Sequence, residues 1–561
     1  MLQLLLGGSG SGKTTLLYQR IRARAEKGEK SILLVPEQFT SSTEGRIYRE
    51  LGDALSGMVE SFSFTSLAEK ILSTEGGAAV QTLSDAGRAV LVRRALEELQ
   101  DNVHYYHRHR RSAAFCQMAA QTIDELKSAG LSGQQLAQLA GACGAESGKL
   151  SELALIFQGY ETLLARSGMD PSDRLELAGA RLEEALARHS LPEFLRDRAV
   201  FIDEFDTFNA PKKRLLGAML AALPSVTVAL CDDGAPLLPG DLSLFSGAKQ
   251  VAAQLRQLAR KNGAEVAVPQ LLRKDLRHRN APGLAAVAEL LETGSCTADA
   301  PAGEVRLFAA PSREEEARAA AGAIRRLMRQ GVRCGKIAVV CRDIAKYRAA
   351  VRYEFRMAEI PLYCDEPTTP EFSAPATAVR ALLEIARGAD LTENLTTLAK
   401  TGLCALSEEQ VCALENYAYT WAPTAAAWRE KFERSPKGFG EQELTEEDLR
   451  NREQAEYARA LLVGAVDAFR ARVRGVNAEA ISRAVYFCLK TLGAEEQQAA
   501  QVKAIRAGRG IPAAEEAARE WNVVMGLLNE MAHLLGEQTV TVAEYEDLFG
   551  LLLRSSDLGH I

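Results

Sequence analysis

Eight consecutive residues near the N-terminus combine four glycines with a lysine and a threonine. They are Gly7, Gly8, Ser9, Gly10, Ser11, Gly12, Lys13 and Thr14, and they fit the pattern GxxxxGK(S/T) of a P-loop. Glycines let successive backbone N–H groups point into one concavity, and the start of the following helix adds positive potential there. In such loops the lysine reaches the outer phosphates and the threonine hydroxyl ligates Mg²⁺. The segment therefore predicts binding of a nucleoside triphosphate, with ATP and Mg²⁺ as the expected pair.

A second candidate is the acidic pair that follows the apolar residues 199–202. A P-loop ATPase needs a carboxylate at the end of a neighbouring strand to hold Mg²⁺, often beside a glutamate that activates the attacking water. Asp203 is the predicted Mg²⁺ carboxylate, together with Thr14, and Glu204 is the candidate general base. A strand that merely ends in solvated acids is the alternative, and the presence of the P-loop favours the functional interpretation.

Two other polar clusters have simpler explanations. Asp232 and Asp233 follow an apolar run and could face the same crevice, but an Asp-Asp-Gly sequence favours a turn. The histidines of a second cluster have three interpretations: a solvated loop between helices, which we favour, a contact with the DNA backbone and a base, or a metal site. A metal is disfavoured because no carboxylate or cysteine completes the set. The cluster consists of His104, His107 and His109 with Tyr105, Tyr106, Arg108, Arg110 and Arg111.

These residues need secondary structure that brings them to one edge of a sheet. Apolar strands predicted at 2–6 and 31–35 flank a helix at 13–27, which indicates a parallel βαβ unit. Residues 82–188 have the pattern of successive helices, and strands return at 199–203 and 226–230. The pattern predicts one α/β domain interrupted by a helical insertion.

A second alternation follows, with strands predicted at 304–308 and 336–340 around a helix at 313–330. Beyond residue 376 the pattern is helical, for example over 452–472 and 512–535. This order is expected of a helicase with two motor domains, the last part of which would lie after residue 561. The predicted domains are 1–80 and 196–300 for the first motor domain, 81–195 for its helical insertion, 301–380 for the start of the second motor domain, and 381–561 for a second helical insertion.

The bulk composition excludes several classes of protein. With 561 residues, 47% hydrophobic residues and a formal charge of -7, the chain resembles ordinary globular proteins and would not coat nucleic acid by net charge alone. Ten cysteines without a CxxC pair argue against zinc sites. No apolar run approaches the roughly 20 residues of a membrane span, and the N-terminus lacks the basic start of a signal peptide. We therefore expect a cytoplasmic protein with no membrane partner.

Short segments in a fixed order resemble the AddB family, the smaller-motor subunits of bacterial AddAB helicase-nucleases. The resemblance covers about residues 1–375. Besides the P-loop, the segments in the first part are Val-Pro-Glu-Gln-Phe-Thr at 35–40, Ser-Phe-Ser-Phe-Thr-Ser-Leu-Ala at 61–68, Ile-Asp-Glu-Leu-Lys at 123–127 and Phe-Ile-Asp-Glu-Phe at 201–205. Those in the second part are 312–316, 337–343 and 360–365, which ends at Asp365.

The resemblance implies a superfamily 1-like P-loop helicase with RecA-like parallel-sheet domains and two large helical insertions. It implies an ATP-dependent helicase/exodeoxyribonuclease subunit, a hydrolase that pairs with an AddA motor as a heterodimer. The pair would act on duplex DNA ends and single strands in recombinational repair. Gln38, in the segment at 35–40, is added to the predicted nucleotide contacts. A C-terminal nuclease domain and its iron-sulfur cluster are expected only beyond residue 561, so no residue is assigned to either.

Two features keep other functions open. Many AddB subunits are degenerate at the second strand motif and are thought to serve in DNA recognition and scaffolding, whereas this chain keeps Asp203 and Glu204. The arginine that would approach the γ-phosphate has three candidates, Arg277, Arg313 and Arg342, each more simply explained as a surface arginine. The alternatives are a catalytically inactive helicase-like scaffold that recognises DNA and supports a partner motor, and an unrelated P-loop ATPase.

Overall fold

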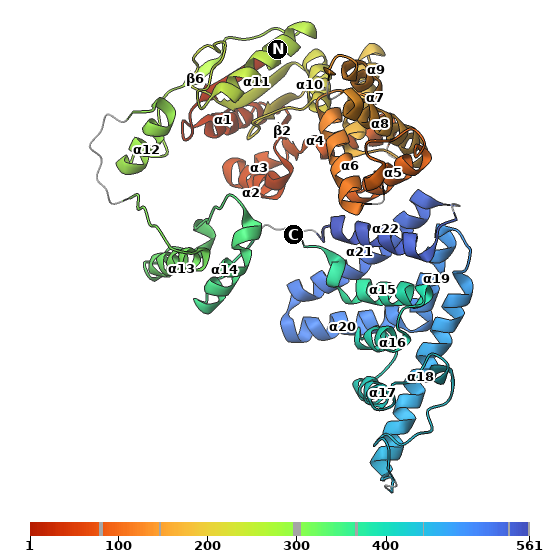
Figure 1. Cartoon of the computed structure of the whole chain (residues 1–561). Helices are drawn as coiled ribbons and strands as arrows, with labels where there is room; N and C mark the ends of the chain where they lie inside the picture. The colour runs from red at the N-terminus through yellow and green to blue at the C-terminus, as the bar shows by residue number, and fades with distance from the viewer. Residues whose placement is uncertain are drawn as a thin grey trace. The chain divides into compact units, whose positions relative to one another are not determined.

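The computed structural model describes residues 1–77, 82–110, 112–144, 147–295, 304–364, 368–440, 443–536 and 539–558, so Arg111 and Asp365 lie outside the described residues. The chain divides into two compact units, each made of separate chain segments (Figure 1). The sheet unit comprises Met1–Val80, Ser128–Gly130 and Pro171–Glu366. The helical unit comprises Gln81–Lys127, Leu131–Asp170 and Pro367–Ile561. Neither unit can therefore form from one uninterrupted stretch of chain.

The described part of the sheet unit contains one six-stranded parallel sheet in the order β3-β2-β4-β5-β1-β6. The strands are β1 (Leu2–Gly7), β2 (Ser31–Leu34), β3 (Val59–Phe62), β4 (Ala199–Ile202), β5 (Ser225–Cys231) and β6 (Gln270–Leu272). The strands predicted at 2–6, 31–35, 199–203 and 226–230 are confirmed. Because all strands are parallel, the P-loop after β1 and the acidic pair after β4 lie at the same edge of the sheet.

Alternate residues of each strand face opposite helical layers, as the two-residue period of a strand requires. Leu4 and Leu6 pack in one core with α4, α9, α10 and α11, whereas Leu5 packs in the other with α1 and α2. The helices of these layers are α1 (Lys13–Ala25), α2 (Thr40–Leu51), α4 (Phe64–Glu75), α9 (Pro171–Ala187), α10 (Ala210–Ala222) and α11 (Ser246–Lys261). The unit also contains α3 (Asp53–Ser56) and α12 (Pro282–Thr293).

The predicted second βαβ unit is wrong in its strands. Its helix is present as α13 (Arg313–Arg329), followed by α14 (Ile344–Met357), but residues 304–308 and 336–340 form no strand. A strand exists only where its backbone pairs with a neighbour, and the described residues supply none for these segments. Leu307 is 101% exposed and Val340 is 91% exposed. The alternation of apolar residues in these segments therefore reflects the strand propensity of the residues, and it does not mark a strand of a sheet.

The helical unit surrounds one large hydrophobic core that includes the fully buried side chains of Trp428, Tyr160 and Tyr545. Its helices confirm the predicted helical segments at 452–472 and 512–535. From the first two chain segments come α5 (Asp85–Glu98), α6 (Ala113–Ser128), α7 (Gly133–Ala140) and α8 (Ser147–Ser167). The last segment provides α15 (Ala374–Arg387), α16 (Leu391–Lys400), α17 (Glu408–Trp421), α18 (Glu446–Arg472), α19 (Ala478–Thr491), α20 (Ala494–Arg509), α21 (Ile511–Leu535) and α22 (Val542–Ser555).

None of the described helices is both long and apolar enough to cross a bilayer.

Candidate nucleotide-binding site

The P-loop turns sharply between β1 and α1. Gly10 and Gly12 adopt φ angles of +78° and +90°, a conformation that favours glycine because a Cβ atom would clash with the backbone. The N–H of Ser11 donates to the carbonyl oxygen of Gly8 at 3.3 Å, and α1 begins directly at Lys13. The loop therefore places backbone N–H groups and the helix N-terminus around one concavity, as a phosphate site requires.

The Lys13 ammonium lies at the mouth of this loop. Its Nζ donates to the carbonyl oxygens of Gly7 and Gly8 at 2.7 and 2.8 Å. Burial lowers the pKa of Lys13, and the nearby groups of Cys231 and Asp203 act in the opposite direction. These two carbonyl groups hold the side chain over the loop.

Asp203 follows β4 and contacts the P-loop directly. It is 6% exposed, accepts a hydrogen bond from the Thr14 side chain, and accepts the backbone N–H of Glu204 at 3.1 Å. Burial raises the pKa of Asp203, whereas the two hydrogen bonds and the charges of Arg46 and Lys13 oppose that rise. The structure therefore brings together the two oxygen donors for which a Mg²⁺ role is predicted.

Glu204 has an unusual backbone for a non-glycine residue, with φ at +65°. Such a conformation costs of the order of 1–3 kcal/mol and is concentrated at functional sites. Burial, followed by the charge of Asp203, raises the pKa of Glu204. A carboxylate whose pKa lies above its usual range is a better proton acceptor, which suits the predicted role of general base.

A cavity of about 500 Å³ joins these groups. Of the predicted residues, Ser9, Gly10, Gly12, Lys13, Thr14, Asp203 and Glu204 line it, with Thr15, Arg46, Phe205, Asp206, Ala229, Cys231, Leu276 and Arg277 completing the wall. Gly7, Gly8 and Ser11 belong to the loop without lining this cavity. Gln38 is exposed in the short helix η1 (Glu37–Phe39) and is not among the lining residues, so its nucleotide contact stays a prediction.

Arg277 is the one of the three candidate arginines that lines the cavity. Its Nη1 donates to Ser9 Oγ at 3.3 Å, and the N–H of Leu276 donates to the Gly10 carbonyl oxygen at 3.0 Å. The segment after β6 therefore packs on the P-loop. Arg313, on α13, and Arg342, before α14, are outside the lining.

Arg46 is a site residue that sequence reasoning missed. It comes from α2, its guanidinium lies 4.9 Å from the centre of the Tyr18 ring, and it lines the cavity. Its positive charge opposes the rise in the pKa of Asp203 and of Glu204. No motif marks a single arginine inside an amphipathic helix, so only the folded arrangement identifies it.

The turn interpretation of Asp232 and Asp233 is confirmed. Asp232 Oδ1 accepts the N–H of Gly234 at 2.6 Å, and Asp233 Oδ1 accepts the N–H of Ala235 at 2.8 Å. Asp232 and Asp233 also line a second cavity, of about 580 Å³, together with Gly8, Ser9 and Ser11 of the P-loop. The histidine cluster lies in the loop between α5 and α6, and the described residues contain no group of His, Cys, Asp and Glu that would hold a metal.

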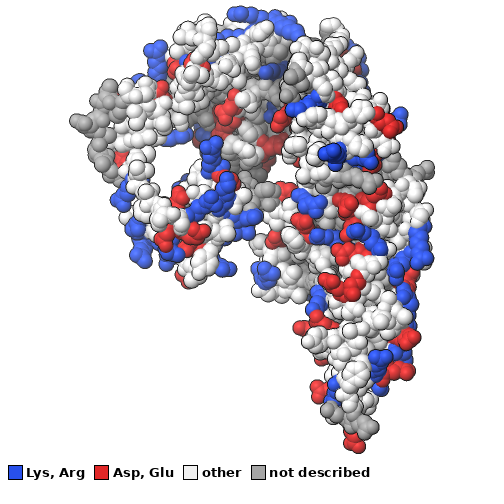
Figure 2. Space-filling model, viewed as in Figure 1, with Lys and Arg blue, Asp and Glu red and all other residues white. Residues whose placement is uncertain are grey.

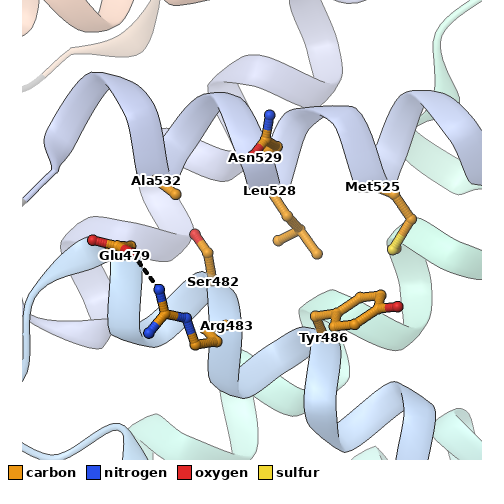
Figure 3. Close-up of a pocket in the computed structure, with 8 residues that line it drawn as sticks. All are labelled: Glu479, Ser482, Arg483, Tyr486, Met525, Leu528, Asn529 and Ala532. Atoms are coloured by element: carbon orange, nitrogen blue, oxygen red, sulfur yellow. Dashed lines mark hydrogen bonds and ion pairs between the residues drawn. The ribbon is translucent and has the colours of Figure 1, made fainter.

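The other large features are less specific. Basic and acidic side chains are mixed over the visible surface, with basic ones frequent over α13 and α14 (Figure 2). A cavity of about 310 Å³ lies between α19 and α21, where Leu528 and Met525 face Tyr486 and an ion pair joins Arg483 to Glu479 (Figure 3). It contains neither a glycine-rich loop nor paired carboxylates, so the P-loop cavity remains the candidate site.

Asp203→Asn should stabilise the fold at neutral pH. Because burial raises the folded-state pKa of Asp203 above its ordinary value of 3.8, folding favours the protonated carboxyl, and ionisation costs stability as pH rises through the folded pKa. The amide removes this cost and should raise the free energy of unfolding by about 0.5–2 kcal/mol at pH 7. Thermal unfolding in Mg²⁺-free buffer at pH 7 and below pH 3.8 checks this, since the gain should vanish in acid. An equal gain at both pH values would contradict it.

A comparison with protein families finds a match to the part of the chain that contains the candidate site. A family model described as "ADDB, N-terminal" matches residues 4–288, a range that contains the P-loop, Asp203, Glu204 and Arg277. This chain belongs to the AddB family. The resemblance noted in the sequence is thereby confirmed, and the match includes strands β2 to β6 completely and most of β1.

Curated relatives of the AddB family align along nearly the whole chain. The ATP-dependent helicase/deoxyribonuclease B subunit of Desulforudis audaxviator is 30% identical, over 97% of this chain and 48% of the relative. The protein of the same name from Moorella thermoacetica is 30% identical over 99% of this chain and 49% of its own length. That of Symbiobacterium thermophilum is 29% identical, over 100% and 50%. The chain thus spans about half the length of the AddB relatives it matches.

Proposed function

We propose that this chain is the ATP-binding part of a helicase-nuclease subunit that processes double-strand DNA ends. The observation that carries the proposal is the contact between Thr14 and Asp203 beside Lys13, in a cavity at the carboxyl edge of a parallel sheet. The names of the relatives, which are helicase/deoxyribonuclease subunits, support the substrate class. We also propose a RecA-like helicase fold for the sheet unit and a heterodimer with an AddA-like motor.

In this proposal each residue has a separate task. The P-loop backbone and Lys13 bind the phosphates, while Thr14 and Asp203 would hold Mg²⁺, whose hard charge suits their oxygen donors. Mg²⁺ neutralises charge on the β- and γ-phosphates when it is bound. Glu204 accepts a proton from the attacking water, and Arg277 approaches the γ-phosphate from the opposite wall. We further propose that the subunit acts in recombinational repair.

Lys13→Ala should weaken ATP binding. Loss of a charge-assisted contact costs about 1.5–3 kcal/mol, which corresponds to a Kd roughly 10- to 150-fold higher. Titration with a fluorescent ATP analogue in Mg²⁺ measures this. Lys27→Ala, an exposed lysine after the same helix, is the matched control and should bind like wild type. Equal affinity for wild type and Lys13→Ala would overturn the proposal.

A further inference from the structure

The loop between α5 and α6 is basic and aromatic. Residues 102–112 contain three arginines, three histidines, two tyrosines and no acidic residue, whereas the whole chain has a formal charge of -7. The nucleotide site uses none of these residues. The loop is part of the helical unit and includes the short helix η2 (His107–His109).

A single carboxylate fixes the backbone of this loop. The Glu152 carboxylate, from α8, accepts the N–H of His104 at 2.9 Å, of Tyr105 at 2.8 and 2.9 Å, and of Tyr106 at 3.1 Å. Three successive N–H groups around one carboxylate form an anion-binding nest. The Glu152 carboxylate is therefore bound by three backbone N–H groups of the loop. These hydrogen bonds fix the backbone from which the loop's side chains project.

The two tyrosines have different roles. Tyr106 is half-buried, with its ring 5.2 Å from that of Phe115, so it anchors the loop to α6. Tyr105 is 56% exposed. Its ring is nearly perpendicular to that of Tyr106, with centroids 5.0 Å apart and an interplanar angle of 78°, and its centre lies 5.4 Å from the Lys149 ammonium. Packing against Phe115 explains Tyr106, whereas Tyr105 keeps more than half of its surface exposed to solvent.

Lys149 is the cation that contacts the exposed Tyr105 ring, and arginines follow Tyr105 in the same loop. Arg108 is exposed and makes no hydrogen bond or ion pair with the residues that the structure describes. Arg110 Nη1 lies 2.7 Å from Nε2 and 3.0 Å from Nδ1 of His107. Together with Lys149, these arginines make the surface cationic. The nearby Glu152 carboxylate is already hydrogen-bonded to the backbone of the loop. The combination of an exposed ring and cations is typical of surfaces that stack a base and hold its phosphates.

We propose that Tyr105, Arg108, Arg110 and Lys149, here called the Tyr105 surface, bind single-stranded DNA. An unpaired base stacks on the Tyr105 ring, and the adjacent phosphates lie against the arginines. Stacking requires an unpaired base, and these four side chains form no set of donors and acceptors for reading base edges, so binding tolerates any sequence. The proposal rests on the proposed function only in that DNA is the substrate, since it does not involve the P-loop.

Tyr105→Trp provides a local reporter in the full chain. A base stacked on the indole should quench its emission, so addition of an oligothymidylate should lower the fluorescence beyond any change in wild type, which contains Trp421, Trp428 and Trp521. An abasic oligonucleotide of equal length has the phosphates without the bases and should not quench. Unchanged emission at saturating oligothymidylate, or equal quenching by the abasic strand or by oligoglutamate, would overturn the proposal. The oligoglutamate result would instead indicate a docking surface for an acidic protein.

Affinity measurements distinguish the contribution of stacking on the Tyr105 ring from that of the positively charged side chains. Tyr105→Ala should raise the Kd for labelled oligothymidylate by about 5- to 100-fold at low salt, whereas Tyr105→Phe should stay within about twofold. Arg108→Gln should weaken binding and make it less dependent on salt. Equal affinity for Tyr105→Ala and wild type, or an equal loss in Tyr105→Phe, contradicts stacking. Tyr105→Ala should bind the fluorescent ATP analogue like wild type, so failure at the P-loop and failure at the Tyr105 surface are distinguishable.

Discussion

Glu204→Gln should lower DNA-stimulated ATP turnover by about 10²–10⁴-fold, the range typical of losing a general base. The amide has almost the same size but cannot accept the proton of the attacking water. Because the predicted phosphate and Mg²⁺ contacts belong to Lys13, Thr14 and Asp203, ATP affinity should remain within about threefold. Phosphate release with the partner motor and duplex ends present measures turnover, and binding of a fluorescent ATP analogue measures affinity.

Two further variants make this result specific. Glu193→Gln changes an exposed glutamate of the same unit and should leave turnover unchanged. Glu204→Gly should be as inactive as Glu204→Gln but more stable, since glycine adopts a φ of +65° without strain. Turnover within threefold of wild type in Glu204→Gln would remove Glu204 as the base. Background turnover in the wild type itself would favour the inactive scaffold.

Trp428→Ala should destabilise the helical unit by about 3–5 kcal/mol, the usual cost of removing a large aromatic side chain from a core. Trp428 is 0% exposed, its Nε1 donates to Thr392 Oγ1 at 2.8 Å, and its ring centre lies 5.4 Å from that of Phe432. Its carbonyl oxygen also accepts Arg459 Nη1 at 2.9 Å, a bond that the substitution leaves in place. The loss is therefore one of packing and of one side-chain hydrogen bond.

Urea unfolding followed by far-ultraviolet circular dichroism tests this prediction, because most of the helical residues that give this signal belong to the helical unit. Trp421→Ala is the matched control, because Trp421 is only partly buried and its Nε1 donates to the Ser435 carbonyl oxygen at 2.8 Å. It should cost clearly less than Trp428→Ala. Equal losses in the two variants would show that burial of Trp428 does not determine the stability of this core.

The sequence predicted the parts of the site that depend on adjacent residues. The P-loop is one continuous segment, and Asp203 follows a four-residue apolar strand, so short patterns suffice for both. Arg46 and Arg277 approach the same cavity from α2 and from the segment after β6. Their proximity depends on the order of the strands in the sheet, which no local pattern specifies.

The strand predictions at 304–308 and 336–340 failed for a related reason. β6, with three residues, is too short to show alternation, yet it exists because it pairs with β1 at Leu5. Residues 304–308 alternate clearly, yet they form no strand because no described segment pairs with them. Pairing, more than propensity, decides which segments become strands.

The strand order has a consequence for synthesis of the chain. β1 is made before the other strands of the sheet, yet Leu2 pairs with Val226 of β5 and Leu5 with Gln270 of β6, so its partners are made much later. At about 5–20 residues per second, β1 waits roughly 10–45 s on the ribosome before β5 emerges. During this time both edges of β1 lack their partners and are open to unintended pairing, and we expect the nascent β1 segment to depend on chaperones until β5 and β6 complete the sheet.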